Sequence, residues 1–175
     1  MAGRPRRVAA APQWLSQAEQ QAWIAVAHLI LQLPGALDAQ LQRDSGISLF
    51  EYLTLSRLSM EPRQTLRMSE LAELTGGSLS RLSNVIKRLE QRKFVRRESD
   101  PDDGRYTNAI LTASGWKKVV AAAPGHAAAV RHLVIDPLEP EQITALSEIG
   151  DHLRRHVRGA CDAAAGRRDD YPSGC

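Results

Sequence analysis

The sequence predicts a mainly α-helical fold with one small β-hairpin, an α+β protein with long helices at both ends. Its 175 residues are 43% hydrophobic and only 5% aromatic, so the core must consist mostly of aliphatic side chains. Apolar residues recur at helical spacing through most of the chain. Two short runs, FVRRES and YTNAILT, flank a turn that contains proline and glycine, as the strands of a hairpin do.

The first long helix is expected to begin after Ser16. Ser16-Gln17-Ala18-Glu19 is a capping box, in which the serine and glutamate side chains bind backbone donors at the start of a helix. Pro34-Gly35 interrupts the apolar pattern, and proline removes a backbone donor, so we expect a kink or a short break there. Residues 1–15 are basic and lack the apolar segment of a secretory signal, so we expect a flexible tail.

A second capping box, Ser48-Leu49-Phe50-Glu51, predicts a helix over residues 49–60. Residues 66–68 are expected to be extended. Ser69 should then cap a short helix that ends at Gly76-Gly77, because serine is favoured at helix starts and glycine at helix ends.

Ser78 is expected to cap a longer helix over residues 79–93, whose two faces differ in polarity. The face that we expect to be buried carries Leu79, Leu82, Val85, Ile86 and Leu89. The opposite face carries Ser80, Arg81, Asn84, Lys87, Arg88 and Gln91.

The hairpin turn lies within SDPDDGRYTNAILTASG, Ser99 to Gly115, where three carboxylates crowd one arginine, Arg105. We interpret Asp100 and Asp102 as turn-forming residues, since aspartate is favoured in turns. For Asp103 we favour a role in fixing the direction of Arg105, with simple turn formation as the alternative.

Two helices are expected after the hairpin. Thr112 should cap the first, which Pro124-Gly125 disturbs, and Pro140 should stand at the first position of the second, where its missing donor costs nothing. Both terminal regions carry apolar stripes beyond the needs of a small central domain. A dimer interface would explain them.

The central order of elements is that of a winged helix-turn-helix: a short helix, a glycine turn, a longer polar helix and a hairpin. A helix fits the major groove of DNA, where arginine or lysine binds guanine and asparagine binds adenine. Residues 81–105 contain eight basic and five acidic residues, an excess equal to the net charge of the whole chain, +3. The alternative is a helical dimerisation or protein-interaction module with a solvated charged face.

The chain resembles bacterial MarR-family transcriptional regulators in two motifs, RMSELAELTGGSLSRLSNVIKRLEQRKFVRRE and DGRYTNAILTASG. The resemblance covers residues 16–160. The wing pattern of the family, D-x-R followed by L-T-x-x-G, falls on Asp103, Arg105, Leu111, Thr112 and Gly115. Lys93 departs from the family, which usually has glycine there. Either this lysine adopts the left-handed conformation or the helix ends differently.

The resemblance implies a non-enzymatic cytoplasmic regulator, a repressor that binds a palindromic site on double-stranded DNA as a homodimer. The recognition helix would enter the major groove, and the wing arginine would meet the adjacent minor groove. The expected DNA-binding residues are Ser80, Arg81, Asn84, Lys87, Arg88, Asp103 and Arg105. The expected segments are a tail (1–15), a dimerisation helix (16–47), a winged helix-turn-helix (48–112), two dimerisation helices (113–161) and a disordered tail (162–175).

The resemblance also implies a small aromatic or phenolic ligand that binds between the dimer helices and the winged helix and releases the DNA. Such a ligand must prefer the conformation that does not bind DNA. The candidate lining residues are Trp23, His28, Tyr52 and Arg57. For Trp23 and Tyr52, core packing is an equally good interpretation.

Other classes of function find little support in the sequence. No nucleophile–base–acid set and no phosphate-binding loop is evident, so we expect neither an enzyme nor a cofactor. His152 and His156 have a spacing that can bind zinc, which keeps a metal-responsive regulator as an alternative, but no third ligand is evident and we expect no metal site. We expect no membrane span, because no apolar stretch reaches the roughly 18 residues that one needs. Cys161 and Cys175 cannot build a disulfide framework, which suits a reducing compartment.

Overall fold

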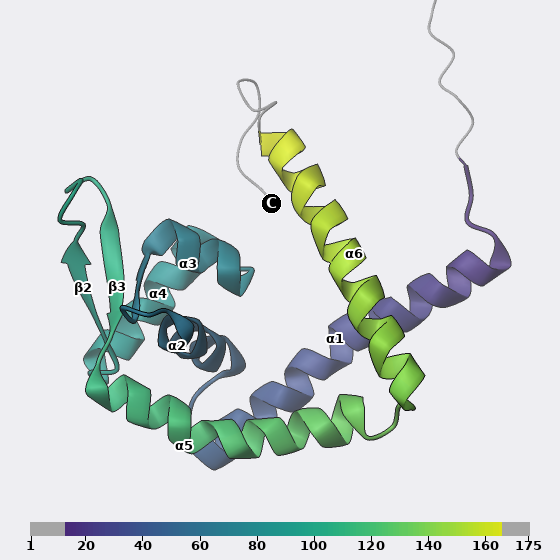
Figure 1. Cartoon of the computed structure of the whole chain (residues 1–175), viewed down its shortest axis with the longest axis horizontal. Coiled ribbons are helices and arrows are strands. Elements are labelled where there is room, and N and C mark those ends of the chain that lie inside the picture. Colours follow the sequence, from purple (N-terminus) through teal and green to yellow (C-terminus); the bar gives the residue numbers. More distant parts are fainter. Residues whose placement is uncertain (1–12, 166–175) are drawn as a thin grey trace, which may run out of the picture. The chain divides into compact units, whose positions relative to one another are not determined.

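The computed structural model describes residues 13–165, which form helices and one small sheet (Figure 1). In chain order the elements are α1 (Gln17–Ser45), α2 (Leu49–Met60), β1 (Thr65–Arg67), α3 (Met68–Thr75), α4 (Leu79–Gln91), β2 (Val95–Ser99), β3 (Thr107–Leu111), α5 (Ala113–Val130), the π-helix η1 (Arg131–Ile135) and α6 (Pro140–Ala165). The chain divides into two compact units, one up to Gly35 and one from Ala36 onward. The predicted fold class, mainly helical with a small wing, is confirmed.

The helix α1 starts at the predicted capping box. The backbone N–H of Ser16 donates to Oε2 of Glu19 at 2.7 Å, and the N–H of Glu19 donates to Oγ of Ser16 at 3.4 Å. The helix continues through Pro34, so a break there is wrong: proline removes one donor, but the residues on both sides remain helical. By length and composition α1 could also cross a membrane, contrary to the expectation that no stretch would be long enough.

The helix α2 begins at the second capping box, as predicted. The N–H of Glu51 donates to Oγ of Ser48 at 3.1 Å, and the N–H of Ser48 donates to Oε2 of Glu51 at 2.9 Å. Leu55 and Leu58 on this helix are fully buried. The capping box therefore fixes the start of a helix that lies in the middle of the core.

The helix α3 begins one residue before Ser69, so the predicted cap is wrong. The carboxylate of Glu70 accepts from the backbone N–H of Arg67 at 3.3 Å, which makes Arg67 the residue at the helix boundary. The extended conformation predicted before this helix is observed as β1. Gly76 ends α3 with a φ of 66°, in the left-handed region that favours glycine.

The helix α4 has the predicted cap and nearly the predicted buried face. The hydroxyl of Ser78 accepts from the N–H of Arg81 at 3.2 Å. The buried side chains are Leu82, Val85, Ile86 and Leu89. Leu79 was expected among them but is 53% exposed, because the first residue of the helix lies at the edge of this face. The helix ends at Gln91, slightly earlier than predicted.

The three strands form an antiparallel sheet in the order β1-β3-β2. The strands β2 and β3 are the predicted hairpin, paired from Val95–Leu111 to Ser99–Thr107. The other edge of β3 pairs with β1, with Thr65 opposite Ile110. Because a lone two-stranded hairpin is only marginally stable, this third strand gives the base of the wing needed support.

The corner between α4, β2 and α5 is held by close backbone contacts. Lys93 has a φ of 59°, so it adopts the left-handed conformation, the first of the two alternatives. Its carbonyl accepts from the hydroxyls of Thr112 and Ser114. At Gly115 an added Cβ would lie 2.1 Å from the carbonyl oxygen of Phe94, so only glycine fits against this backbone.

Two clusters of buried residues make up the core. The larger one joins α2, α3, α4 and the sheet, and it includes the buried leucines of α2 and the buried face of α4. The smaller one joins the end of α1 with α2 and α5 and contains Leu41, Ile47, Tyr52 and Ala122. The larger cluster thus holds α4 with its polar face outward. The smaller cluster packs α5 against α2 and the end of α1.

The helices after the wing begin as predicted. The hydroxyl of Thr112 accepts from the N–H of Gly115 at 3.1 Å and caps α5, which continues through Pro124. Pro140 is the first residue of α6, which includes Cys161 and continues to Ala165. The expectations for residues 1–12 and 166–175, parts of the two tails, lie outside the described residues.

Candidate nucleic-acid interface

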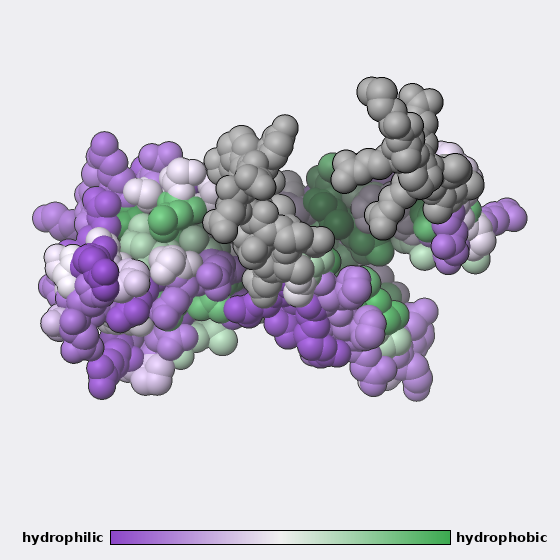
Figure 2. All heavy atoms as spheres, turned by 90° about the horizontal axis from the view of Figure 1, so that it is seen from above, coloured by the Kyte–Doolittle hydropathy of each residue, from purple (hydrophilic) through white to green (hydrophobic). Residues whose placement is uncertain are grey.

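A polar stripe runs along α4 on the side opposite its buried face. Ser80, Asn84 and Lys87 are exposed and separated by four and three residues, so they lie on one side of the helix. Their hydroxyl, amide and ammonium groups are of the kinds that bind base edges and phosphates. In the view of Figure 2, the winged-helix part of the chain, at the left, shows mainly hydrophilic residues.

Arg81 and Arg88 lie beside this stripe and contact α2. The guanidinium of Arg81 stacks over the ring of Phe50, 4.3 Å from the ring centroid. Arg88 Nε donates to Glu51 Oε1 at 3.3 Å. The carboxylate of Glu51 is almost fully buried and also pairs with Arg92, at 3.7 Å. Both of the predicted DNA-binding arginines on α4 therefore have partners within the protein that fix their direction.

The turn of the wing holds Arg105 against Asp103, as the sequence suggested. Oδ1 of Asp103 accepts from the backbone N–H and from Nε of Arg105 at 3.1 and 2.9 Å, and Oδ2 accepts from Nη2 at 2.6 Å. These hydrogen bonds keep the pKa of the Asp103 carboxyl below its ordinary value and raise the pKa of Arg105. The arginine side chain is nevertheless 84% exposed, so it is fixed in direction and open to solvent.

Asp100 does more than form a turn, which corrects the expectation for this residue. Its Oδ1 accepts from the backbone N–H groups of Asp102 and Asp103 at 3.0 and 3.2 Å, as a turn residue should. Its Oδ2 accepts from Nε of Arg67 at 2.9 Å and from Nδ2 of Asn108 at 3.3 Å. The bond from Arg67, followed by the backbone bonds, keeps the pKa of the Asp100 carboxyl below its ordinary value.

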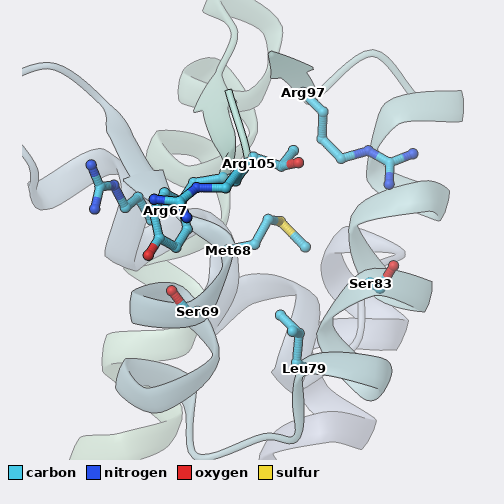
Figure 3. A pocket seen from close by; sticks show the side chains of 9 residues that line it. Arg67, Met68, Ser69, Leu79, Ser83, Arg97 and Arg105 are labelled. Atoms are coloured by element: carbon cyan, nitrogen blue, oxygen red, sulfur yellow. The ribbon is translucent and has the colours of Figure 1, made fainter. Parts of the chain in front are cut away.

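A groove of about 370 Å³ lies between the wing, the start of α3 and α4 (Figure 3). Its lining residues are Arg67, Met68, Ser69, Leu79, Ser83, Arg97, Arg105, Tyr106 and Thr107. Three of these side chains are arginines, and Figure 3 shows Arg97 on the α4 side and Arg67 on the other. Arg97 pairs with Glu90, with Nη2 2.7 Å from Oε2. The groove thus lies between the wing and the helix-turn-helix and is lined by cationic side chains together with apolar ones.

The candidate ligand-binding residues are placed differently from one another. Trp23 and His28 are exposed on α1, and Arg57 is exposed on α2. Tyr52 is buried, and its ring centroid lies 4.5 Å from that of His126. Burial lowers the pKa of His126, whose Nδ1 is buried without a hydrogen-bond partner. Tyr52 therefore has the core-packing role that the sequence left open.

His152 and His156 are both exposed on α6. Among the side chains that the structure describes, residues 13–160, no group of three or more His, Cys, Asp or Glu is arranged to hold a metal ion.

Sequence reasoning missed two residues at this surface, Arg67 and Tyr106. The guanidinium of Arg67 lies 4.6 Å from the centroid of the Tyr106 ring, in addition to its bond with Asp100. Arg67 and Asp100 are far apart in sequence, so no local pattern indicates their pairing. The one available signal was a basic residue directly before the first helix of a helix-turn-helix.

Two solved structures resemble this chain along most of its length. Sco3205, a MarR family transcriptional regulator from Streptomyces coelicolor crystallised in complex with DNA, is 41% identical, with a TM-score of 0.79 over 85% of this chain and 92% of that one. AbsC, a MarR family regulator from the same organism, is 37% identical, with a TM-score of 0.78 over 85% of this chain and 99% of that one.

Sequence comparisons agree with the structural ones. The model of the MarR family matches residues 45–105, the stretch from the end of α1 to the wing arginine. YdcH of Bacillus subtilis, an uncharacterized HTH-type transcriptional regulator, is 31% identical over 75 residues, which span 43% of this chain and 51% of YdcH. With the long matches to Sco3205 and AbsC, these findings mean that the chain belongs to the MarR family of DNA-binding transcriptional regulators.

Proposed function

We propose that this regulator is a repressor that binds a palindromic operator as a homodimer in the cytoplasm, with α4 in the major groove and Arg105 at the adjacent minor groove. The observation that carries the proposal is the pairing of Arg105 with Asp103 beside the polar stripe of α4. This arrangement supports two contacts with one duplex, one through a helix and one through a fixed arginine.

The polar stripe supplies the contacts in the major groove. Asn84 has the amide that forms two hydrogen bonds with adenine, and Lys87 can donate to guanine or to a phosphate. Ser80 at the start of the helix is suited to a phosphate or a base edge. Arg81 and Arg88, which contact α2 beside the stripe, carry the charge that neutralises backbone phosphates, and we assign them to phosphates beside the groove.

The wing supplies the contact in the minor groove. A narrow minor groove has an enhanced negative potential that attracts arginine. The exposed Arg105 side chain fits this role, and the Asp103 carboxylate would limit the conformational freedom that the arginine loses on binding.

Exposed apolar side chains on the long helices support the homodimer. Those on α1 are Trp23, Ile24, Val26, Leu29, Ile30 and Leu31. Those on α6 are Leu146, Ile149, Leu153 and Val157. Because soluble proteins rarely leave such stretches in water, pairing with a second copy is the proposed role of both helices. This role also accounts for the length and apolar character of α1 without a membrane.

Release of DNA by a small aromatic or phenolic ligand is the second part of the proposal. The smaller core cluster joins α1, α2 and α5, and it includes the Tyr52–His126 contact. A ligand that changed this junction would act on the helix that continues directly from the wing. It would release DNA to the extent that it binds the altered conformation more tightly.

The test uses a fluorescein-labelled duplex selected from a randomised pool by the wild-type protein. The Arg105→Ala variant should lose about 1–3 kcal/mol of binding free energy. Replacing adenine by 2,6-diaminopurine, which adds an amino group in the minor groove, should weaken the wild type and leave Arg105→Ala unaffected.

The matched control is Arg131→Ala, which removes an equal charge from η1, where Arg131 pairs with Asp136 at 2.8 Å. It should bind as the wild type does. Undiminished binding by Arg105→Ala would refute the role of the wing. If the wild type retained no duplex from the pool, a helical protein-interaction module would be the better interpretation.

A further inference from the structure

The link between Arg67 and Asp100 ties the turn of the wing to the helix-turn-helix. Arg67 ends β1 and directly precedes α3, whereas Asp100 follows β2. Their side chains meet at 2.9 Å, and Asp100 is only 8% exposed. The guanidinium of Arg67 also stacks on Tyr106, the neighbour of Arg105. One side chain from the helix-turn-helix therefore contacts both ends of the turn.

The hydrogen bonds continue from this link to the wing arginine. Asp100 accepts from the backbone N–H of Asp103, and its own N–H donates to the carbonyl of Tyr106 at 2.9 Å. Asp103 in turn holds the guanidinium of Arg105 through both carboxylate oxygens. The order of contacts is thus Arg67 to Asp100, Asp100 to the backbone of Asp103, and Asp103 to Arg105.

Polar contacts are the main support of this turn. The last pair of the hairpin ladder is Ser99 with Thr107. Between them, Pro101, Asp102 and Gly104 are exposed, and Tyr106 is 43% exposed. Since these residues bury little apolar surface, the conformation of the turn depends on the carboxylate of Asp100 and on what holds it.

We propose that Arg67 and Asp100 are positioning residues that set the direction of Arg105 toward the minor groove. Arg67 acts through Asp100 and needs no contact with DNA of its own. The inference rests on the proposed role of Arg105. It adds that Arg67, directly before α3, controls the direction in which Arg105 meets the minor groove.

The first test needs no DNA. Hydrogen exchange measured by NMR should show the amides of Asp102 and Asp103 exchanging about tenfold faster in Arg67→Gln than in the wild type. The amides of α4 should keep their protection. Arg96→Gln is the matched control, since Arg96 pairs with Glu98 on its own strand, and it should leave both turn amides unchanged.

Two outcomes of this test would overturn the inference. Unchanged exchange at both turn amides would mean that Arg67 does not hold the turn. Loss of protection throughout α3 and α4 would make Arg67 a general structural residue. Asp100→Asn, which removes the charge and keeps one acceptor, should accelerate the same two amides and checks the link from its other side.

The second test is a double-mutant cycle on the selected duplex. Arg67→Gln should weaken DNA binding about tenfold in the wild-type background and less than about twofold in the Arg105→Ala background. The effects should not add, because both substitutions remove the same minor-groove contact. The dependence of binding on salt should be the same for Arg67→Gln and Arg67→Gln/Arg105→Ala. The penalty from 2,6-diaminopurine should shrink in Arg67→Gln, which a loss of stability alone would not cause.

Additive losses, with the salt dependence of Arg67→Gln/Arg105→Ala about one ion below that of Arg105→Ala, would show that Arg67 itself contacts phosphate and would overturn the inference alone. Wild-type binding by Arg105→Ala would overturn the proposed role of the wing and this inference with it. As the control for this cycle, the effects of Arg96→Gln and Arg105→Ala on binding free energy should add in the double variant.

Discussion

The helix α4 and the wing are held in place by different forces. Leu82, Ile86 and Leu89 on α4 are completely buried in the larger core cluster. The turn of the wing instead depends on two carboxylates, Asp100 and Asp103, and on the donors around them. Of the two elements proposed to contact DNA, α4 is thus fixed by apolar packing and the wing by directed hydrogen bonds.

The difference predicts two kinds of failure. Apolar packing has no preferred direction and is shared by every element of the core, so a defect in α4 should lower the stability of the whole domain. Hydrogen bonds act on particular atoms, and a defect in the turn should misdirect Arg105 while the domain stays folded. Stability measurements and DNA-binding measurements should therefore separate the two regions.

The largest effect is expected from Ile86→Ala, which truncates a side chain with no exposed surface. The free energy of unfolding should fall by about 2–5 kcal/mol, because the truncation removes buried apolar atoms and leaves a cavity that the surrounding structure closes only in part. Urea denaturation followed by circular dichroism measures this loss. Asp103→Asn in the turn is the comparison, and its midpoint should lie close to that of the wild type. Equal losses in both variants would refute the proposed division.

A smaller effect should distinguish Lys87, on the polar stripe of α4, from Arg88, which lies beside the stripe and contacts α2. Lys87→Ala should weaken DNA binding by about 1 kcal/mol and reduce the salt dependence by about one ion, with no change in stability, if Lys87 contacts phosphate. Arg88→Ala should also lower the stability by up to about 1 kcal/mol, because it breaks a half-exposed pair with Glu51. Fluorescence anisotropy at several salt concentrations, together with urea denaturation, distinguishes the two. An unchanged salt dependence of binding in Lys87→Ala would mean that Lys87 does not contact a phosphate.

The smallest effect is a dependence of stability on acid. The pKa values of Asp100 and Asp103 are lowered in the folded protein, first of all by hydrogen bonds from Arg67 and Arg105 respectively. A carboxyl group whose pKa is lower in the folded than in the unfolded protein stabilises the fold at pH values above its unfolded pKa, about 3.9. This contribution is lost as the pH falls through the folded pKa. The free energy of unfolding, measured by urea denaturation at decreasing pH from about pH 5, should fall less steeply in Asp100→Asn than in the wild type. Parallel curves would mean that Asp100 contributes nothing through its charge.

Local patterns in the sequence were sufficient to predict most of the fold. The caps at Ser48, Ser78 and Thr112 were each predicted from residues within three positions, because a capping hydrogen bond is a local event. The predictions that failed depended on context. Ser69 has the composition of a cap, but the pairing of β1 with β3 sets the chain direction before α3, and Arg67 becomes the boundary residue.

The same limit applies to the candidate site. The pair of Asp103 and Arg105 is two residues apart and was predictable, whereas Arg67 and Asp100 meet only after β1 has joined the sheet. The exposed stripe of α4 was evident from periodicity. The contacts of Arg81 and Arg88 with α2 were not, because they depend on how two helices pack.

Gly115 at the start of α5 packs directly against the backbone carbonyl of Phe94, just before β2. The hydroxyls of Thr112 and Ser114 fasten this junction to the carbonyl of Lys93. A rotation of α5 would therefore turn the hairpin with it instead of bending the chain. Because Arg105 is at the far end of the hairpin, even a small rotation at this junction would move the arginine by a larger distance than it moves the junction.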